Sequence, residues 1–355
     1  MDSVLPVPRS PRWLALDIMK TVAIFIMILV HTIIMNGSKE TIYSNFFYGL
    51  ILVLEGIGAP AFVLAMGVSI TLKNRSNRLK IFTRGLQLFV LGYLLNFLKF
   101  YPTIVLFKTF PNELFIETYR SNDYEGIVSF LLLGDILQFA AIAYIICANL
   151  YLWSFFKNHC FYIGNIVALL IFISSPMLYI YKPDSYLISF LYGETFQVYF
   201  PLFPWIGFAF IGLSIGAYYK SNSPFNKNFL FTGILLTIVG IVGILYDKDT
   251  FGKDYYHRGM GGLIVYSGQL ILFLFLYSYI STYFSKGLQN FIKFCSKNVT
   301  LIYIIQWVLI YWNWYFIPYY SQNWTMICMF FILYLITTLL LTKFFNKIIN
   351  YLKYA

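Results

Sequence analysis

Residues 12–32 read RWLALDIMKTVAIFIMILVHT, and this stretch decides the class of protein. It is apolar over about 20 residues, which is the length that an α-helix needs to cross the hydrocarbon core of a bilayer. After Arg12, the apolar run contains three ionisable side chains, Asp17, Lys20 and His31. Such groups are costly in lipid, so they predict a stripe that faces the interior of a helix bundle.

The composition of the whole chain agrees with a membrane protein. Of its 355 residues, 60% are hydrophobic and only 11% are charged. A water-soluble domain carries about 25% charged residues, and a disordered chain lacks so many apolar ones. These values exclude a soluble globular enzyme, a disordered chain and a small disulfide-rich secreted domain. The net charge of +11 is explained by basic clusters between apolar runs, so no nucleic-acid partner is predicted.

The apolar runs predict an all-α helix bundle of about ten transmembrane helices in one domain, 1–355. The stretch 44–54 is also apolar and either lengthens the second span or forms a separate half-helix. The ten predicted spans are 13–35, 56–73, 81–100, 129–153, 160–181, 200–219, 229–246, 261–284, 299–317 and 324–344.

The charges of the connecting segments predict the orientation. Lysine and arginine gather in alternate connections, as in the basic segment from Lys73 to Arg84, and acidic residues gather in the others. Because basic loops stay cytoplasmic, both termini are predicted to be cytoplasmic. An eleventh span would break this alternation. In this scheme Lys99 is counted as a basic residue of an outer connection.

The polar residues of the first span carry most of the functional signal. Asp17 and Lys20 are i,i+3 neighbours, and His31 follows Lys20 by about three turns, or about 16 Å along the axis. With the N-terminus inside, His31 lies towards the outer face of the membrane. The alternative interpretation is a structural ion pair near the inner boundary together with an interfacial histidine.

Three further sites combine polar residues with helix breaks or span ends. Glu55 precedes the break GIGAP and either lines a cavity or caps a helix. Asp135, in LLLGDILQF, lies deep enough in a predicted span to face a cavity. His257 and Arg258, in DYYHRGMGG, either bind an anionic or sugar substrate or belong to a solvated loop.

Several enzyme and transporter classes lack their signatures here. No Walker A lysine loop, GxSxG, HExxH or DxD motif is present, which argues against ATP-driven transport and against the corresponding hydrolases. The chain has only three histidines, far apart in the sequence. No metal site is therefore predicted.

The first span also resembles a known pattern. Arg12, Asp17 and His31 match in kind and spacing the opening of the membrane acyltransferase superfamily, with Lys20 where that family usually has arginine. This superfamily includes the heparan-alpha-glucosaminide N-acetyltransferase catalytic domain, its prokaryotic relatives and the type 3 acyltransferases. Further similar stretches are GAPAFVLAMGVSITL (58–72), RGLQLFVLGYLLN (84–96), LGDILQFAAIAYII (133–146), FPLFPWIGFAFIGLSIGA (200–217) and SKNVTLIYIIQWVLI (296–310), where Gln306 occupies a position at which the family often has histidine.

The resemblance implies transfer of an acyl group, usually acetyl from acetyl-CoA, to a glycan or another cell-envelope acceptor. His31 aligns with the family's catalytic histidine, and we predict Asp135 as a second catalytic residue. Imidazole either takes a proton from the acceptor or carries the acyl group itself. The remaining predicted site residues bind substrate: Asp17, Lys20, Glu55, Trp205, His257 and Arg258.

The predicted reaction moves the acyl group from cytoplasmic acyl-CoA to an extracytoplasmic or lipid-linked acceptor, in contact with membrane lipid. The amino-acid usage, rich in Ile, Phe, Tyr, Asn and Lys, indicates a prokaryotic plasma membrane. The alternative function is a transporter or flippase that uses the same polar stripe without covalent chemistry. Helix breaks near Glu55 and Pro60 would suit that alternative.

Overall fold

The computed structural model describes residues 12–73, 77–183, 185–193, 197–221, 227–246 and 255–354. Over these residues the fold is entirely helical, with two isolated β-bridges and no strand. The predicted all-α class is therefore confirmed. Residues 74–76, inside the predicted basic loop, lie outside the described residues.

The helices follow one another along the chain with short connections. Their bounds are α1 Leu14–Asn36, α2 Lys39–Ile42, α3 Asn45–Leu54, η1 Glu55–Ile57, α4 Ala59–Leu72, α5 Arg78–Tyr101, η2 Pro102–Leu106, α6 Asn112–Glu117, α7 Tyr124–Leu131, α8 Ile136–Leu152, α9 Ser154–Asn158, α10 Cys160–Leu178, α11 Tyr186–Ser189, α12 Leu202–Ser221, α13 Lys227–Tyr246, α14 Met260–Ile280, η3 Ser281–Tyr283, α15 Lys286–Lys297, α16 Val299–Trp312, η4 Asn313–Tyr315 and α17 Trp324–Tyr354.

Among the described residues, eight helices are long and apolar enough to cross a membrane. The pair α15 and α16 passes the same test together, with a bend of 73° at the break between them, and brings the total to nine. The stretch Asn45–Leu72, which joins α3 to α4 through η1, counts as one span. The protein is thus a multi-pass membrane protein, and the 44–54 segment extends the second span.

The predicted span 129–153 differs from the structure. The helix breaks after Leu131, and the 17-residue α8 begins only at Ile136. Asp135 caps the N-terminus of α8, where its side chain accepts from the backbone N–H of Ile136 at 2.7 Å. An aspartate at an N-cap satisfies backbone donors that a continuous helix would not expose. The predicted carboxylate therefore lies at a helix start and not within a helix.

Tight helix pairs form the frame around the site. Gly67 of α4 faces the backbone of α12 so closely that a Cβ at this position would lie 2.1 Å from the carbonyl oxygen of Ala209. A Cβ at Gly212 of α12 would lie equally close to the carbonyl of Leu64. Small residues that allow backbones to touch are typical of membrane helix pairs. The contact holds α4 and α12 together as one wall of the bundle.

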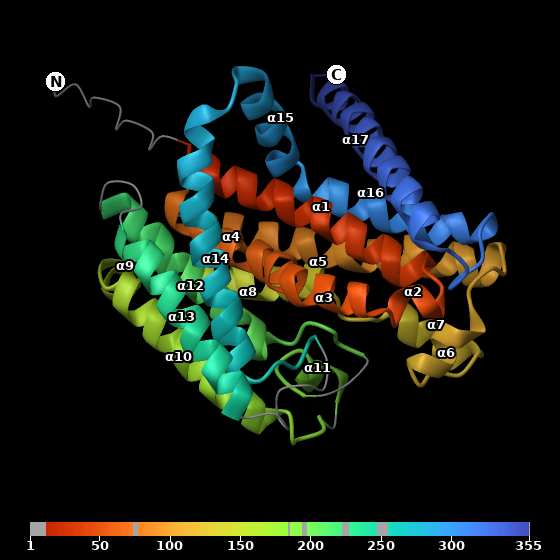
Figure 1. The fold of residues 1–355 in the computed structure, drawn as a ribbon, viewed down its shortest axis with the longest axis horizontal. Helices are drawn as coiled ribbons and strands as arrows, with labels where there is room; N and C mark the ends of the chain where they lie inside the picture. The colour runs from red at the N-terminus through yellow and green to blue at the C-terminus, as the bar shows by residue number, and fades with distance from the viewer. Residues whose placement is uncertain are drawn as a thin grey trace.

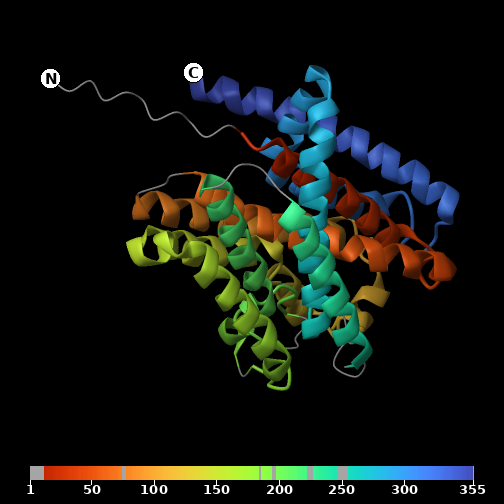
Figure 2. The same ribbon diagram turned by 60° about the vertical axis from the view of Figure 1, so that its left-hand side comes forward.

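Helix α1 runs between several other helices, with contacts to α4, α14, α15, α16 and α17. Figure 1 shows α2, α6 and α7 together at one end of α1. In Figure 2, α13 and α14 run side by side as a separate pair. The central position of α1 places His31 where helices from both halves of the chain meet.

Candidate active site

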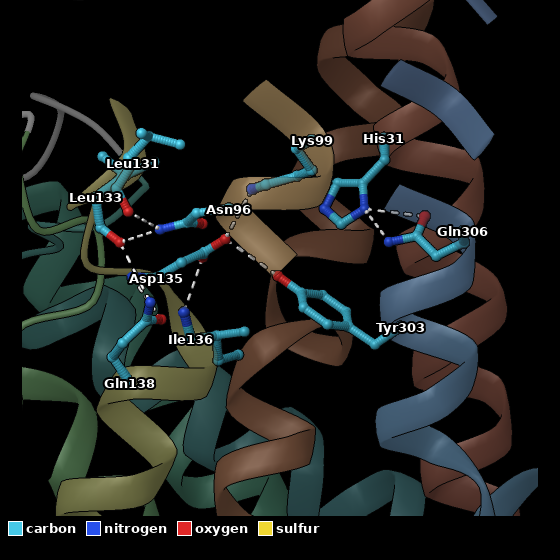
Figure 3. Close-up of polar contacts among 10 residues, drawn as sticks. All are labelled: His31, Asn96, Lys99, Leu131, Leu133, Asp135, Ile136, Gln138, Tyr303 and Gln306. Carbon is cyan, nitrogen blue, oxygen red and sulfur yellow. Dashed lines mark hydrogen bonds and ion pairs between the residues drawn. The ribbon is translucent and has the colours of Figure 1, made fainter. Parts of the chain in front are cut away.

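Two consecutive residues of α16 hold His31. The amide of Gln306 lies beside the imidazole, with its Nε2 at 3.1 Å and its Oε1 at 3.4 Å from Nδ1 of His31. The ring of Trp307 stacks on the imidazole, with 3.9 Å between ring centroids. One ring nitrogen and one ring face are thus occupied by protein. This arrangement orients the imidazole, and Figure 3 shows it beside a charged cluster.

That cluster is built from Lys99, Asp135 and Tyr303. Nζ of Lys99 lies 3.6 Å from Oδ2 of Asp135, and the hydroxyl of Tyr303 donates to the same oxygen at 3.3 Å. The side chain of Lys99 is only 3% exposed. Its ammonium group also lies over the rings of Trp307 and Tyr311, at 5.0 and 5.5 Å from their centroids. The cluster is therefore a buried ion pair surrounded by aromatic rings.

Local capping explains why Asp135 points into this cluster. Gln138 completes a capping box, in which its Oε1 accepts from the backbone N–H of Asp135 at 3.2 Å. The side chain of Asn96 on α5 donates to the carbonyls of Leu131 and Leu133, at 3.2 and 2.7 Å. These bonds pair backbone carbonyls in the segment between α7 and α8. Unpaired backbone groups are costly inside a membrane.

A cavity of about 290 Å³ runs along α8 from Tyr151 to Ile136. Along the helix axis this separation is about 22 Å. Lys20, Lys73, Arg84 and Lys297 line it, and no aspartate or glutamate is among its lining residues in the part of the chain described. Met, Ile and Leu side chains form much of its remaining wall, and Tyr303 lines it as well. The cavity thus combines an apolar channel with cationic groups and reaches Tyr303 of the charged cluster, whereas His31 and Asp135 are not among its lining residues.

Lys20, which lines the cavity, and Asp17 do not form the predicted pair with each other. Nζ of Lys20 donates to Oγ of Ser69 at 3.0 Å. Asp17 instead receives two hydrogen bonds from Arg12, at 2.5 and 3.0 Å, and one from Ser296 at 2.5 Å. Asp17 does not line the cavity. The reason is that α15 packs against α1 on the side of Asp17, whereas Lys20 faces α4.

A second charged cluster brings together two predicted residues that are distant in sequence. Nη2 of Arg258 lies 2.5 Å from Oε2 of Glu55, and the hydroxyl of Tyr266 donates to the same oxygen at 2.7 Å. Tyr255 donates to the backbone carbonyl of Glu55 at 3.3 Å. Burial, together with the Glu55 carboxylate, raises the pKa of Tyr255 well above its ordinary value. This hydroxyl therefore stays protonated and remains a donor at neutral pH.

The two other predicted substrate-binding residues pack between loops near this cluster. The indole N–H of Trp205 donates to the carbonyl of Tyr256 at 3.1 Å, and its side chain is fully buried. Nε2 of His257 donates to the carbonyl of Gly193 at 2.7 Å. Their contacts are with the protein itself, and their part in substrate binding stays a prediction.

Sequence reasoning missed Lys99 and Tyr303. Lys99 was assigned to an outer connection, but α5 continues through it to Tyr101, and its side chain is buried. The available signal was the spacing of Asn96 and Lys99, an i,i+3 pair of polar residues on an apolar helix. Tyr303 gave no comparable signal, because the chain has 31 tyrosines.

A comparison with known families now identifies the chain. The family described as heparan-alpha-glucosaminide N-acetyltransferase, catalytic, matches residues 12–243, which is more than half of the chain. The protein belongs to this family. Its members are acetyltransferases that use acetyl-CoA as the donor. No curated protein matches the chain.

The matched region contains only part of the observed site. His31, Lys99 and Asp135 lie inside residues 12–243, whereas Tyr303 and Gln306 lie beyond it, on α16. The fold closes the site by bringing α16 against α1. Among the described residues, no group of three or more His, Cys, Asp or Glu side chains is arranged to hold a metal ion.

Proposed function

We propose that this protein transfers an acetyl group from cytoplasmic acetyl-CoA, or another acyl-CoA, to an extracytoplasmic or lipid-linked glycan or other cell-envelope acceptor. One observation carries the proposal: a cation-lined cavity extends along α8 and reaches the cluster beside His31. The family supplies the donor. In this proposal residues 1–355 form one catalytic domain in a prokaryotic plasma membrane.

The donor fits the charge and shape of the cavity. Coenzyme A carries several phosphate charges at one end and a thin thioester arm at the other. Lys20, Arg84 and Lys297 offer ammonium and guanidinium groups to phosphate. The apolar wall suits the arm, which would place the thioester near Tyr303. The cationic end of the cavity belongs to connections that are predicted to face the cytoplasm.

His31 then supplies the chemistry. It takes the proton of the acceptor hydroxyl or amine as that group attacks the thioester carbonyl, or it first accepts the acetyl group itself. In either route the carbon–sulfur bond of the thioester breaks, and coenzyme A leaves as a thiolate that takes up the proton. Gln306 and Trp307 hold the ring for either route. Asp135 contacts Tyr303 and Lys99 beside the imidazole of His31. Through these two residues it would fix the charge near the imidazole.

The decisive experiment measures release of coenzyme A from acetyl-CoA by purified protein in liposomes, with His31→Ala beside the wild type. His159→Ala is the matched control, because this exposed histidine lies outside both the cavity and the cluster. We expect turnover by the wild type and by His159→Ala and none by folded His31→Ala. Full turnover by His31→Ala would contradict the catalytic role of His31.

The same experiment tests the transporter alternative. Its structural support is the helix break at η1, between α3 and α4. A transporter moves its substrate without breaking the thioester, so acetyl-CoA would remain intact in every variant, with and without added acceptors. Coenzyme A release that depends on His31 excludes this alternative.

A further inference from the structure

A second cavity lies outside the site described above, between α15 and the C-terminal turns of α17. Phe294 of α15 forms one wall, and residues of α17 between Leu340 and Asn350 form the other. Its volume is about 540 Å³. In Figure 1, α15 and the C-terminal end of α17 both lie at the top of the view.

The groove combines two cations with apolar side chains. Lys343 and Lys347 both line it, and their i,i+4 spacing places them on one face of α17. Phe294, Leu340 and Phe344 supply the apolar contacts. This pairing of ammonium groups with aromatic and aliphatic side chains suits a ligand that is anionic at one end and apolar at the other.

The described part of the chain places no carboxylate against these lysines. The last aspartate or glutamate in the sequence is Asp254, so the whole segment that forms α14–α17 lacks carboxylate side chains. Within the described residues, no carboxylate forms an ion pair with Lys343 or Lys347. An anionic group of a ligand suits these two ammonium groups.

The length of α17 places the groove at a membrane surface. Its 31 residues extend over about 46 Å, which exceeds the roughly 30 Å of the hydrocarbon core. Beyond Thr342 the apolar residues Phe344, Phe345, Ile348 and Ile349 are exposed, at 57, 40, 38 and 42%. Basic helical segments with such exposed apolar faces lie in the interface and attract anionic lipids.

Helix α15 contributes a second amphipathic surface. Its Ile292 and Cys295 are buried against the bundle, whereas Leu288 and Phe291 are each 41% exposed. The helix also carries Lys286 and Lys293. Of these α15 residues none lines the groove itself, to which α15 contributes Phe294, whereas both lining lysines come from α17.

We propose that this groove binds an anionic phospholipid. The phosphate of the headgroup contacts Lys343 and Lys347, and the acyl chains lie against Phe294, Leu340 and Phe344. The groove shares no lining residue with the cavity proposed for the donor, so the two proposals are tested separately.

The test measures binding of phosphatidylglycerol to the purified full-length protein in a neutral detergent by native mass spectrometry. Each lysine near a membrane surface contributes about a fivefold gain in affinity for an anionic lipid, so Lys343→Gln/Lys347→Gln should weaken binding roughly 30-fold. Lys343→Arg/Lys347→Arg, which keeps both charges, should bind nearly as the wild type does. The matched control Lys39→Gln/Lys182→Gln, with the same loss of charge far from the groove, should also bind normally.

Two further probes identify the ligand. Phosphatidylcholine should bind at least tenfold more weakly than phosphatidylglycerol, and inorganic phosphate at millimolar concentration should not displace the lipid. Equal lipid binding by Lys343→Gln/Lys347→Gln and the control Lys39→Gln/Lys182→Gln overturns the proposal. Equal binding of phosphatidylglycerol and phosphatidylcholine overturns it as well. Displacement by inorganic phosphate would also overturn it, because it would show an anion site and not a lipid site.

Discussion

The cavity along α8 and the cluster around Glu55 both contain charged side chains, but these charges have different partners. Arg258 and Tyr266 both engage the carboxylate of Glu55, so this charge is satisfied inside the protein. The lining of the cavity includes Lys20 and Arg84 and, among the described residues, no carboxylate. A neutralised pair holds helices together, whereas cations that face a cavity without acidic neighbours suit an anionic ligand.

By this comparison Lys99 and Asp135 resemble the cluster around Glu55, because their charges are paired inside the protein, although they lie beside His31. They neutralise each other in a place where either charge alone would be very costly. Their position near the catalytic candidate is therefore compatible with a supporting role. Four substitutions distinguish charges that are paired inside the protein from cations that line the cavity, here in order of decreasing effect.

The largest effect is expected for Lys99→Met. It removes the ammonium group and leaves the Asp135 carboxylate buried without its counter-charge. Loss of one partner of a buried pair destabilises by about 3–5 kcal/mol. Thermal unfolding in detergent should show a strong loss, with Lys80→Met on the exposed start of the same helix as the control. The double variant Lys99→Met/Asp135→Leu should recover most of it; equal melting of Lys99→Met and Lys80→Met would contradict the ion pair.

Glu55→Gln should destabilise the protein without weakening the binding of acetyl-CoA. The change removes the charge that Arg258 and Tyr266 both contact, at a cost of about 1–3 kcal/mol. The KM for acetyl-CoA should not change, because Glu55 does not line the cavity. Exposed Glu40→Gln serves as the control for unfolding. A raised donor KM with unchanged stability would show that Glu55 serves the donor site.

Lys20→Gln should have the opposite signature. It removes a cation from the cavity but breaks no ion pair, since Lys20 donates to Ser69. The KM for acetyl-CoA should rise about tenfold, which corresponds to about 1.4 kcal/mol, while the melting temperature stays at or above that of the wild type. Lys80→Gln, which removes a charge outside the cavity, controls for net charge. An unchanged KM would remove Lys20 from the donor site.

The smallest effect is expected for Tyr303→Phe. Only the hydroxyl that donates to Asp135 is lost, and the ring remains in the cavity wall. A hydrogen bond to a charged group contributes about 1.5–3 kcal/mol. This one is long, and Asp135 keeps its contacts with Lys99 and the backbone N–H of Ile136, so a shift in unfolding below that range should accompany a modest fall in kcat. Tyr162→Phe, at an exposed ring, is the control. A complete loss of turnover would show that the hydroxyl contacts the reacting atoms.

Local pattern was sufficient for the membrane class and for the existence of most helices. The apolar run around His31 predicted α1 because its length matches a bilayer and its few polar residues share one stripe. The apolar pattern alone missed the helix break before Ile136. Asp135 and Gln138 form a capping box there, which is a local helix-start signal, and Asn96 of a neighbouring helix donates to the carbonyls of Leu131 and Leu133.

The sequence pattern could not predict which side chains of the site contact one another. Asp17 and Lys20 are neighbours on the surface of α1, yet packing sends them to different helices, because Asp17 meets Ser296 and Lys20 meets Ser69. Glu55 and Arg258 were each singled out, but nothing in their local sequence predicts that they meet. Long-range pairing depends on how the helices pack.

The sequence by itself determined that this chain lies in a membrane, because so apolar a chain cannot cover itself with polar groups in water, and it determined that His31 is an expensive residue in its helix. Only the tertiary structure decided which charges are satisfied and which remain available to a ligand. That decision depends on a few ångströms of separation between helices. Periodicity along one helix contains no information about that separation.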